Sequence, residues 1–446
     1  MHGRGSSSAY EFHDAPVVST RVEGWLVLSD IHFNPFDDPA IVDSLAASKP
    51  DQWGAIFQGG TGRAPSAYGT DTNYLLWSST VAALQQAEHF PRVILIAGDL
   101  LGHNFRALFD AAAKDHSQAA YESFVDKTIA FLALELGRAF PETEFLPAVG
   151  NTDSYCGDYA PAIGSPFFAH MAAAWEPLVN HRNAAPDFVR QFSKGGYYTV
   201  FVPWTSVRVV VANSVFWSAK YSDRCAAPDT HPGADELEWL KKTLTVTDAP
   251  RTWILTHIPP GMDARASAAE NRPVSFYDPS DLSPILNLVD TPAANVRLVI
   301  AGHTHGDSFR LTRAGTSSGN VPIWLAPSVS PIFKNNPAFF LASVAPDRGE
   351  VVDYLAYALD DAPGGEGAWR PEYRFTSATE QARFTPQALS DLRGQLATDA
   401  AQRARFEEAY VAGSPVSAID DRSWRAYWCA IGSMTPDQIK SCLGPP

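Results

Sequence analysis

Five apolar segments of the chain are each followed within a few residues by side chains that can bind a metal ion, and this recurrence constrains the fold most strongly. Each segment is a short run of mainly aliphatic and aromatic residues, which is typical of a buried strand. In open α/β sheets, sites form outside the carboxyl ends of the strands. The sequence therefore predicts that these ends meet around one site. The segments span residues 25–29, 92–97, 144–149, 251–256 and 296–300.

The side chains that follow these segments are carboxylates, an amide and imidazoles. After the last segment, two histidines stand one residue apart in Gly-His-Thr-His-Gly-Asp at 302–307 and can aim into one small space. Neutral imidazole is a good ligand for zinc, iron or manganese-type ions. Each motif alone is weak, because turn-forming Asp and Asn and surface His are common, but their joint occurrence predicts a metal site. The candidate ligands are Asp30, His32, Asp99, Asn151, His257, His303 and His305.

This ligand set fits two divalent ions bridged by one aspartate. Such ions lie ~3.5–4 Å apart and clamp the attacking and leaving oxygens of an in-line displacement at phosphorus. The high share of imidazole favours Zn²⁺, with iron or manganese as alternatives.

The bulk sequence excludes two classes of protein. A formal net charge of −15 over 446 residues argues against non-specific binding of nucleic-acid polymers, which requires a basic surface. No apolar run approaches the ~20 residues of a membrane span. We therefore expect a soluble protein, which we take to be a monomer, acting on a small molecule or a lipid.

The four cysteines are even in number, and Cys429 and Cys442 are close enough in sequence for a local disulfide. Paired cysteines would place the protein outside the reducing cytosol, so we predict a secreted or periplasmic location. The alternative is that all four are buried free thiols.

The motifs, taken in order, resemble those of the calcineurin-like metallophosphoesterases. They are Asp-x-His at 30–32, Gly-Asp at 98–99, Gly-Asn at 150–151, His257 and Gly-His-x-His at 302–305. A finer resemblance to the acid sphingomyelinase-like branch rests on His103, four residues after Asp99, and on the segments 257–261, 302–307, 325–331 and 335–337. The resemblance implies an α/β four-layer sandwich of two mixed sheets flanked by helices, with a helical C-terminal segment.

The same resemblance implies how the ligands divide. One ion would take Asp30, His32, Asp99 and His305, and the other Asp99, Asn151, His257 and His303. A hydroxide bridging the two ions would attack phosphorus, because bound metal lowers the pKa of water.

The chain departs from the family where a histidine usually follows the asparagine, because Thr152 occupies that position. A hydroxyl is a poor general acid at neutral pH, although it can hydrogen-bond a phosphoryl oxygen. We therefore assign protonation of the leaving oxygen to His103, with Asp153 as the weaker candidate. For substrate contacts we expect Asn104 and Asn213, with Trp217 and Tyr221 stacking on a base or holding a choline.

The chain divides into three regions. Residues 1–22 form a flexible tail, residues 23–360 the catalytic domain, and residues 361–446 a helical subdomain with helices predicted at 386–413 and 421–443. Within the catalytic domain, residues 35–78 lack periodicity, which indicates a lid or pocket-forming insertion or, equally, a packed surface excursion.

The function expected from these features is metal-dependent hydrolysis of a phosphodiester of the sphingomyelin or choline type or of the nucleotide type. A phosphomonoesterase or a nucleotide pyrophosphohydrolase on the same site is the enzymatic alternative. A catalytically weakened metal- or ligand-binding protein is the alternative from another class, and Thr152 is its support.

Overall fold

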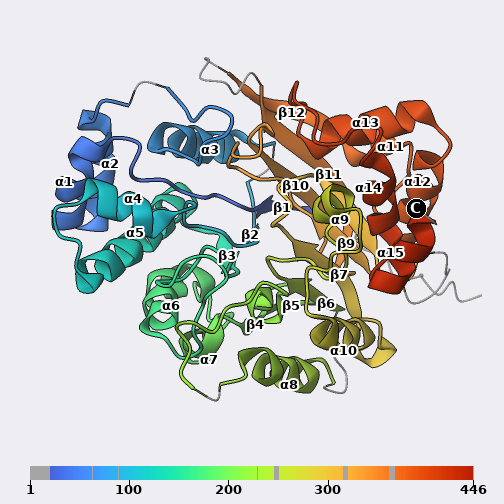
Figure 1. Ribbon diagram of the computed structural model, residues 1–446, viewed down its shortest axis with the longest axis horizontal. Helices are drawn as coiled ribbons and strands as arrows, with labels where there is room; N and C mark the ends of the chain where they lie inside the picture. Colours follow the sequence, from blue (N-terminus) through green and yellow to red (C-terminus); the bar gives the residue numbers. More distant parts are fainter. Residues whose placement is uncertain are drawn as a thin grey trace, which may run out of the picture.

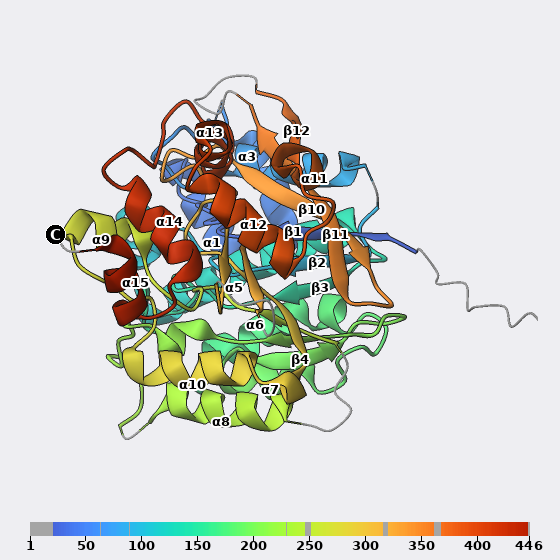
Figure 2. The same cartoon turned by 90° about the vertical axis from the view of Figure 1, so that its right-hand side faces the viewer.

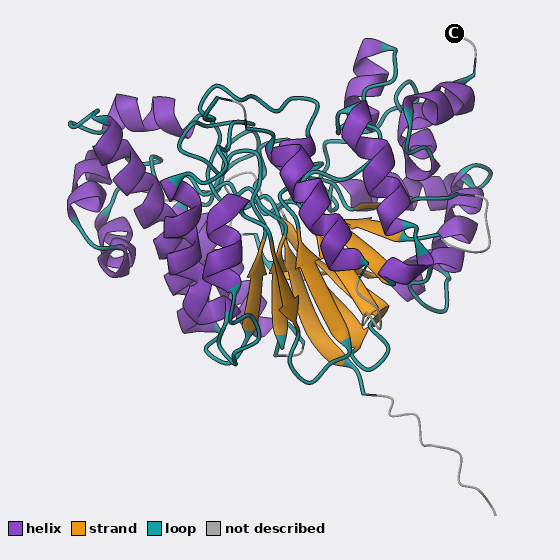
Figure 3. Cartoon of the chain, turned by 90° about the horizontal axis from the view of Figure 1, so that it is seen from below, coloured by secondary structure: helices purple, strands orange, loops and turns teal. Residues whose placement is uncertain are grey.

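The computed structural model describes residues 21–62, 64–88, 90–228, 230–245, 251–314, 320–360 and 367–444. Most of the predicted tail at 1–22 lies outside these residues. Two six-stranded sheets form the centre of the described part of the molecule, and Figure 3 shows many loops gathered at one end of the strands. The strands are β1 (Glu23–Leu28), β2 (Val93–Ile96), β3 (Glu144–Pro147), β4 (Tyr198–Phe201), β5 (Val207–Val211), β6 (Arg251–Leu255), β7 (Val296–Ala301), β8 (Ser308–Leu311), β9 (Pro322–Leu325), β10 (Ala338–Ala345), β11 (Glu350–Leu359) and β12 (Trp369–Arg374).

The first sheet has the order β12-β11-β10-β1-β2-β3. β1, β2 and β3 are parallel, with Leu28 paired to Ile96 and Ile96 to Pro147. This register aligns the carboxyl ends of the three strands, so the residues that follow them emerge side by side. β10, β11 and β12 extend the sheet in antiparallel fashion on the other side of β1.

The second sheet has the order β4-β5-β6-β7-β9-β8. β5, β6, β7 and β9 are parallel, and the antiparallel strands β4 and β8 form its edges. Leu255 at the end of β6 pairs with Ile300 near the end of β7. The ligand-bearing ends of β6 and β7 are therefore aligned as well.

The two sheets pack through large aromatic side chains. Trp25 of β1 meets Trp253 of β6 with ring centroids 5.0 Å apart, and Trp324 of β9 stacks on Phe340 of β10 at 4.7 Å. All four side chains are buried. Burial of rings of this size supplies much of the apolar area that holds such layers together.

Helices cover the outer faces. Figure 1 shows α1–α5 at one end of the molecule and α11–α15 at the opposite end, and Figure 2 shows α8 and α10 side by side under the second sheet. The α-helices are α1 (Val42–Ala47), α2 (Trp53–Gly59), α3 (Tyr74–Gln86), α4 (Phe105–Ala112), α5 (Gln118–Ala139), α6 (Pro166–Val179), α7 (Phe188–Gly195), α8 (Pro232–Leu244), α9 (Ala264–Glu270), α10 (Pro279–Val289), α11 (Phe375–Thr379), α12 (Pro386–Leu396), α13 (Ala400–Tyr410), α14 (Trp424–Gly432) and α15 (Pro436–Leu443). Short 3₁₀ helices lie at Pro39–Ile41, Pro50–Gln52, Ser214–Trp217 and Pro292–Ala294. The predicted α/β four-layer architecture is confirmed.

The structure refines the predicted elements in several places. The segment 35–78 contains the short helices α1 and α2, and Trp53 and Phe57 pack against Phe131 of α5. The helices predicted at 386–413 and 421–443 are each broken in two, because Asp399 and Thr435 cap new helices with their side chains. Residues 369–374, placed by prediction in the helical subdomain, form β12 of the first sheet.

All four cysteines form disulfides, Cys156–Cys225 and Cys429–Cys442. The predicted local pair is therefore present, and the alternative of free thiols is wrong. No helix within the described part of the chain is long and apolar enough to cross a membrane.

Candidate metal centre

The seven predicted ligands converge where the two sheets meet. Asp30 and His32 follow β1, Asp99 follows β2, Asn151 follows β3, His257 follows β6, and His303 and His305 follow β7. The backbone N–H of His303 donates to Asp30 Oδ2 at 3.0 Å, which ties the second sheet to the first. A Cβ on Gly302 would lie 1.8 Å from Ser29 Oγ, and one on Gly150 would lie 2.1 Å from the Asp99 nitrogen. Only glycine permits these approaches.

The backbone is strained at five of the seven ligands. Each of the five has a positive φ, in the left-handed region that non-glycine residues avoid at a cost on the order of 1–2 kcal/mol. Such strain persists only where surrounding contacts impose it, and it clusters at functional sites. The residues are Asp30 (50°), His32 (44°), Asp99 (55°), His303 (69°) and His305 (57°).

One group of ligand atoms is formed by Asp30, His32 and His305. His305 Nε2 lies 3.2 Å from Asp30 Oδ1 and 3.2 Å from His32 Nε2. Asp30 and His32 are fully buried, and His305 is 4% exposed.

A second group is formed by Asp99, His257 and His303. His257 Nε2 lies 3.0 Å from Asn151 Oδ1 and 3.3 Å from His303 Nδ1. Asn151 therefore belongs to this group by geometry.

Asp99 joins the two groups through a single oxygen. Its Oδ2 lies 3.4 Å from His32 Nε2 and 3.2 Å from His257 Nε2. A shared carboxylate of this kind is the arrangement expected when one aspartate bridges two ions.

The outer hydrogen bonds fix which atoms face the centre. His32 Nδ1 lies 3.1 Å from the Leu101 carbonyl and His257 Nδ1 lies 2.7 Å from the Ala97 carbonyl, so in the neutral rings both Nε2 lone pairs point inward. Asn151 donates its amide to Asp158 Oδ1 at 2.7 Å, which leaves its carbonyl oxygen facing His257. The inward-facing lone pairs and carboxylate oxygens cannot donate hydrogen bonds to one another. A set of ligand atoms of this kind fits divalent cations.

Considered without metal ions, the buried carboxylates of the centre favour positive charge on neighbouring histidines. Burial would lower the pKa of His32, but the Asp99 and Asp30 carboxylates outweigh it and raise that pKa to about 10. For His257, burial is likewise outweighed by Asp99, and the pKa rises to about 9. Burial and the nearby His257 lower the pKa of His303 to about 3. Protons and metal ions compete for such a site, so metal affinity falls as the pH falls.

Thr152 faces the Asp99 carboxylate that the two ligand groups share. Its backbone N–H donates to Asp99 Oδ1 at 2.8 Å, and its hydroxyl lies 3.0 Å from the same oxygen and 2.8 Å from the Leu101 carbonyl. These contacts hold Oδ1 and leave Oδ2 to the two histidines. Thr152 therefore contacts the Asp99 carboxylate directly, and its catalytic role stays a prediction.

Asp153 is fully buried beneath the centre. Its Oδ1 accepts hydrogen bonds from the backbone of Leu100 and Leu101, and its Oδ2 accepts one from Gly150. Burial and the charge of Asp99 raise its pKa to about 6. These contacts tie Asp153 to the backbone on either side of Asp99, at residues 100–101 and 150, and its role as the weaker general-acid candidate stays a prediction.

His103 lies at the edge of the centre with an acidic partner that the sequence did not indicate. Its ring stacks on His32 with centroids 4.1 Å apart, and its side chain is 30% exposed. Asp71 Oδ1 lies 3.0 Å from His103 Nδ1, and Asp71 Oδ2 accepts the His103 backbone N–H at 2.7 Å. The contact fixes the imidazole and leaves its Nε2 as the atom directed away from Asp71.

A cavity of about 510 Å³ opens over the centre, a size typical of small-molecule sites. It extends from the ligands to the helices α9, α13 and α14. Its lining includes cationic, aromatic and acidic side chains in addition to the ligands. They are His103, Asp158, Tyr159, Lys220, Asp263, Arg265, Phe276, Arg310, Phe333, Tyr410 and Tyr427.

The four residues predicted to contact substrate lie outside this cavity. Asn213 is fully buried and donates its amide to the Gly195 carbonyl. Trp217 is buried and donates to the Gly233 carbonyl, while the Tyr221 hydroxyl donates to the Pro161 carbonyl at 3.4 Å. Asn104 is exposed at the start of α4. Packing and turn formation account for these positions.

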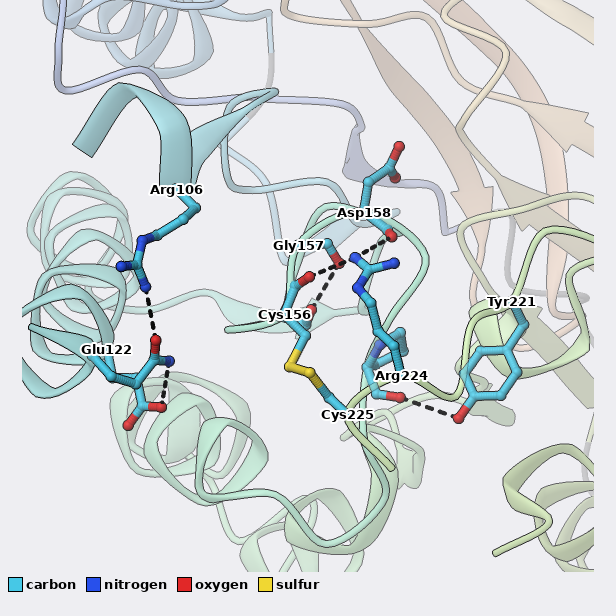
Figure 4. Close-up of a disulfide and its surroundings, with 11 residues drawn as sticks. Arg106, Glu122, Cys156, Gly157, Asp158, Tyr221, Arg224 and Cys225 are labelled. Carbon is cyan, nitrogen blue, oxygen red and sulfur yellow. Dashed lines mark hydrogen bonds between the residues drawn. A yellow bond between two sulfur atoms is a disulfide. The ribbon is translucent and has the colours of Figure 1, made fainter. Parts of the chain in front are cut away.

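A disulfide fixes the loop that forms one wall of the cavity. Figure 4 shows Cys156–Cys225 linking the loop of Asp158 to the loop of Tyr221, with Arg224 donating to the Asp158 carbonyl at 3.1 Å. Tyr159, next in the chain, places its hydroxyl 3.3 Å from His303 Nε2. The bridge therefore anchors residues that face the centre.

Comparison with known proteins agrees with this geometry. A sequence model of the family described as calcineurin-like phosphoesterase matches residues 25–307. The cyclic GMP-AMP phosphodiesterase SMPDL3A of Mus musculus is 25% identical over 72% of this chain and 72% of its own length. The sphingomyelinase phosphodiesterase C of Dictyostelium discoideum is 23% identical over 84% and 82%. The acid sphingomyelinase-like phosphodiesterase 3b of Homo sapiens is 22% identical over 93% and 89%.

Proposed function

Because the chain belongs to the calcineurin-like phosphoesterase family, we propose that it is a phosphodiesterase that works through two divalent ions at the centre described above. The observation that carries the proposal is the position of Asp99 Oδ2, within 3.4 Å of a histidine from each ligand group. Asp30, His32 and His305 would hold one ion, and Asn151, His257 and His303 the other, with Asp99 shared. Zn²⁺ suits this imidazole-rich set best.

The ions, when bound, supply Lewis-acid activation of water and of the phosphoryl oxygens. The chain's own residues do the rest. Thr152 and the outer carbonyls of Ala97 and Leu101 keep the ligand atoms aimed inward. His103, held by Asp71 beside the centre, is placed to give a proton to the leaving oxygen.

The substrate is a small or lipid phosphodiester that fits the cavity. Tyr159, Phe276 and Phe333 line it and offer aromatic faces to a base or a choline group. The printed names of the relatives cover both a sphingomyelinase and a cyclic GMP-AMP phosphodiesterase. With two disulfides in the chain, a secreted or periplasmic location accompanies the proposal.

The test compares two chromogenic substrates on zinc-loaded protein. We expect bis-p-nitrophenyl phosphate to be hydrolysed with higher kcat/KM than p-nitrophenyl phosphate, and elemental analysis to find about two metal ions per chain. Markedly faster turnover of the monoester would favour the phosphomonoesterase alternative. Fully folded, metal-free and inactive protein would favour the binding-protein alternative.

Thr152 gives a second prediction, since its hydroxyl has two acceptors within reach. Thr152→Val keeps the side-chain shape and removes the donor to Asp99, so we expect zinc affinity to fall about 10- to 100-fold, as for other outer-shell partners of metal ligands. Thr152→Ser retains the hydroxyl and serves as the matched control. Competition with a chromogenic chelator measures the affinity. An unchanged affinity in Thr152→Val would mean that the hydroxyl serves the Leu101 carbonyl instead.

A further inference from the structure

Arg310 is a buried cation in the wall of the same cavity. It lies on β8, is 4% exposed and lines the cavity together with His103 and His303. Phe276 contacts both Arg310 and the centre, with its ring 5.4 Å from the His303 ring and Arg310 Cζ 5.2 Å over its face. The guanidinium and the predicted metal ligand His303 thus contact the same aromatic ring.

The guanidinium has no hydrogen-bond or ion-pair partner among the residues that the structure describes, and its Nη1 is buried and unsatisfied. Arg208 shows the usual arrangement for an equally buried arginine, because it donates to Thr252 Oγ1 and to the Thr243 carbonyl. A buried charge without a partner is costly, and arginine is rarely buried unpaired. Burial lowers the pKa of Arg310 only to about 10, so it is cationic at neutral pH.

The surroundings keep this position open for a cation. Gly261 has a φ of 108°, and a Cβ there would come within 2.9 Å of Arg310 Nη1. Of the two outer carboxylates of the cavity, Asp158 accepts a hydrogen bond from the Asn151 amide and Asp263 accepts one from the Ala266 backbone. Asp263 acts on Arg310 through its charge alone, without a hydrogen bond or an ion-pair contact to it. Lys220 and Arg265 add positive charge to the cavity wall, on a chain whose net charge is −15.

We propose that Arg310 forms an anion subsite that binds a second phosphoryl group of the substrate, one that is not cleaved. The inference rests on the proposed function, since it assumes that the scissile phosphoryl group lies at the metal centre. The planar guanidinium can bind a phosphate in bidentate fashion. The substrate class is therefore a phosphoric ester with two phosphoryl groups. A choline ester with a single phosphate would bring a like charge toward Arg310.

The test measures binding by calorimetry on zinc-loaded protein with three matched ligands. AMP carries one phosphate, ADP adds a second next to it, and adenosine 3′,5′-bisphosphate adds it across the ribose. We expect at least one of the two doubly phosphorylated ligands to bind wild-type protein about 10-fold or more tightly than AMP. Arg310→Gln should weaken that ligand about 10- to 100-fold and reduce its advantage over AMP, because a charge-assisted hydrogen bond is lost. Which ligand gains shows whether the second phosphate is adjacent or remote.

Two further variants control the experiment. Arg310→Lys keeps the charge and should retain part of the preference, and Arg297→Gln, an exposed arginine on β7, should leave all three affinities as in wild type. Equal binding of the three ligands by wild-type protein overturns the subsite without need of any variant. So does an equal loss for all three in Arg310→Gln. Hydrolysis of bis-p-nitrophenyl phosphate is measured separately: an inactive protein that still prefers a second phosphate would contradict the phosphodiesterase proposal and leave the subsite standing.

Discussion

Replacing Asp99 by asparagine is expected to abolish turnover and to reduce the metal content from about two ions per chain to one or fewer. Asp99 Oδ2 is the one carboxylate oxygen within 3.4 Å of both His32 and His257 among the described residues. An amide in its place carries no charge to bridge two cations. The loss of kcat/KM on bis-p-nitrophenyl phosphate should exceed about 1,000-fold, because the chemistry depends on both ions. Steady-state kinetics and elemental analysis of the same preparation measure the two effects.

Asp126→Asn is the matched control. Asp126 is half-buried and accepts a hydrogen bond from Tyr155, away from the centre. It should keep full metal content and turnover. Circular dichroism excludes misfolding of Asp99→Asn. If Asp99→Asn retained two ions and more than a tenth of the activity, the shared-carboxylate assignment would be wrong.

The sequence alone identified the fold and the seven residues that the structure brings together at the centre. It could do so because parallel strands in register place their carboxyl ends side by side, so that Asp30, Asp99 and Asn151 need no long-range information beyond strand order. His303 and His305 share a face after β7 for the same reason. The branch resemblance added His103.

The partners that come from outside the strand ends were not predictable in this way. Asp71 lies in the segment 35–78, which has no periodicity, and reaches His103 only through the folding of that segment. Asn213 and Trp217 resemble pocket residues by type, but their side chains satisfy buried backbone carbonyls instead. Arg310 did leave a signal, because a charged residue between Phe309 and Leu311 in a short strand is unusual.

Substitution of His103 is the second change with a large expected effect on kcat, and the size of that effect should depend on the leaving group. A general acid matters most when the departing oxygen is strongly basic. We expect His103→Gln to lower kcat about 100- to 10,000-fold on a diester with an alkyl leaving group, and far less on bis-p-nitrophenyl phosphate. The matched substrates are methyl aryl phosphodiesters in which the basicity of the departing phenolate is varied while the methyl group stays on phosphorus, assayed at one pH with equal metal content. Equal losses across the series would instead assign His103 a structural or binding role.

Substitution of Asp71 tests whether this residue acts by orienting His103 for proton transfer. Asp71→Asn keeps an acceptor oxygen for the His103 backbone N–H but alters the partner of His103 Nδ1. If Asp71 acts through His103, its substitution should lower kcat in the same leaving-group-dependent way but by a smaller factor. The double variant should then lose no more activity than His103→Gln alone, because the effects of residues that act as a unit are not additive. Additive losses would mean that Asp71 acts independently of His103. One way to do so would be to hold a further cation together with His32 and His103, because these three residues form a group that could bind a metal ion. The metal content of Asp71→Asn distinguishes the two explanations, since only loss of such a cation site lowers it.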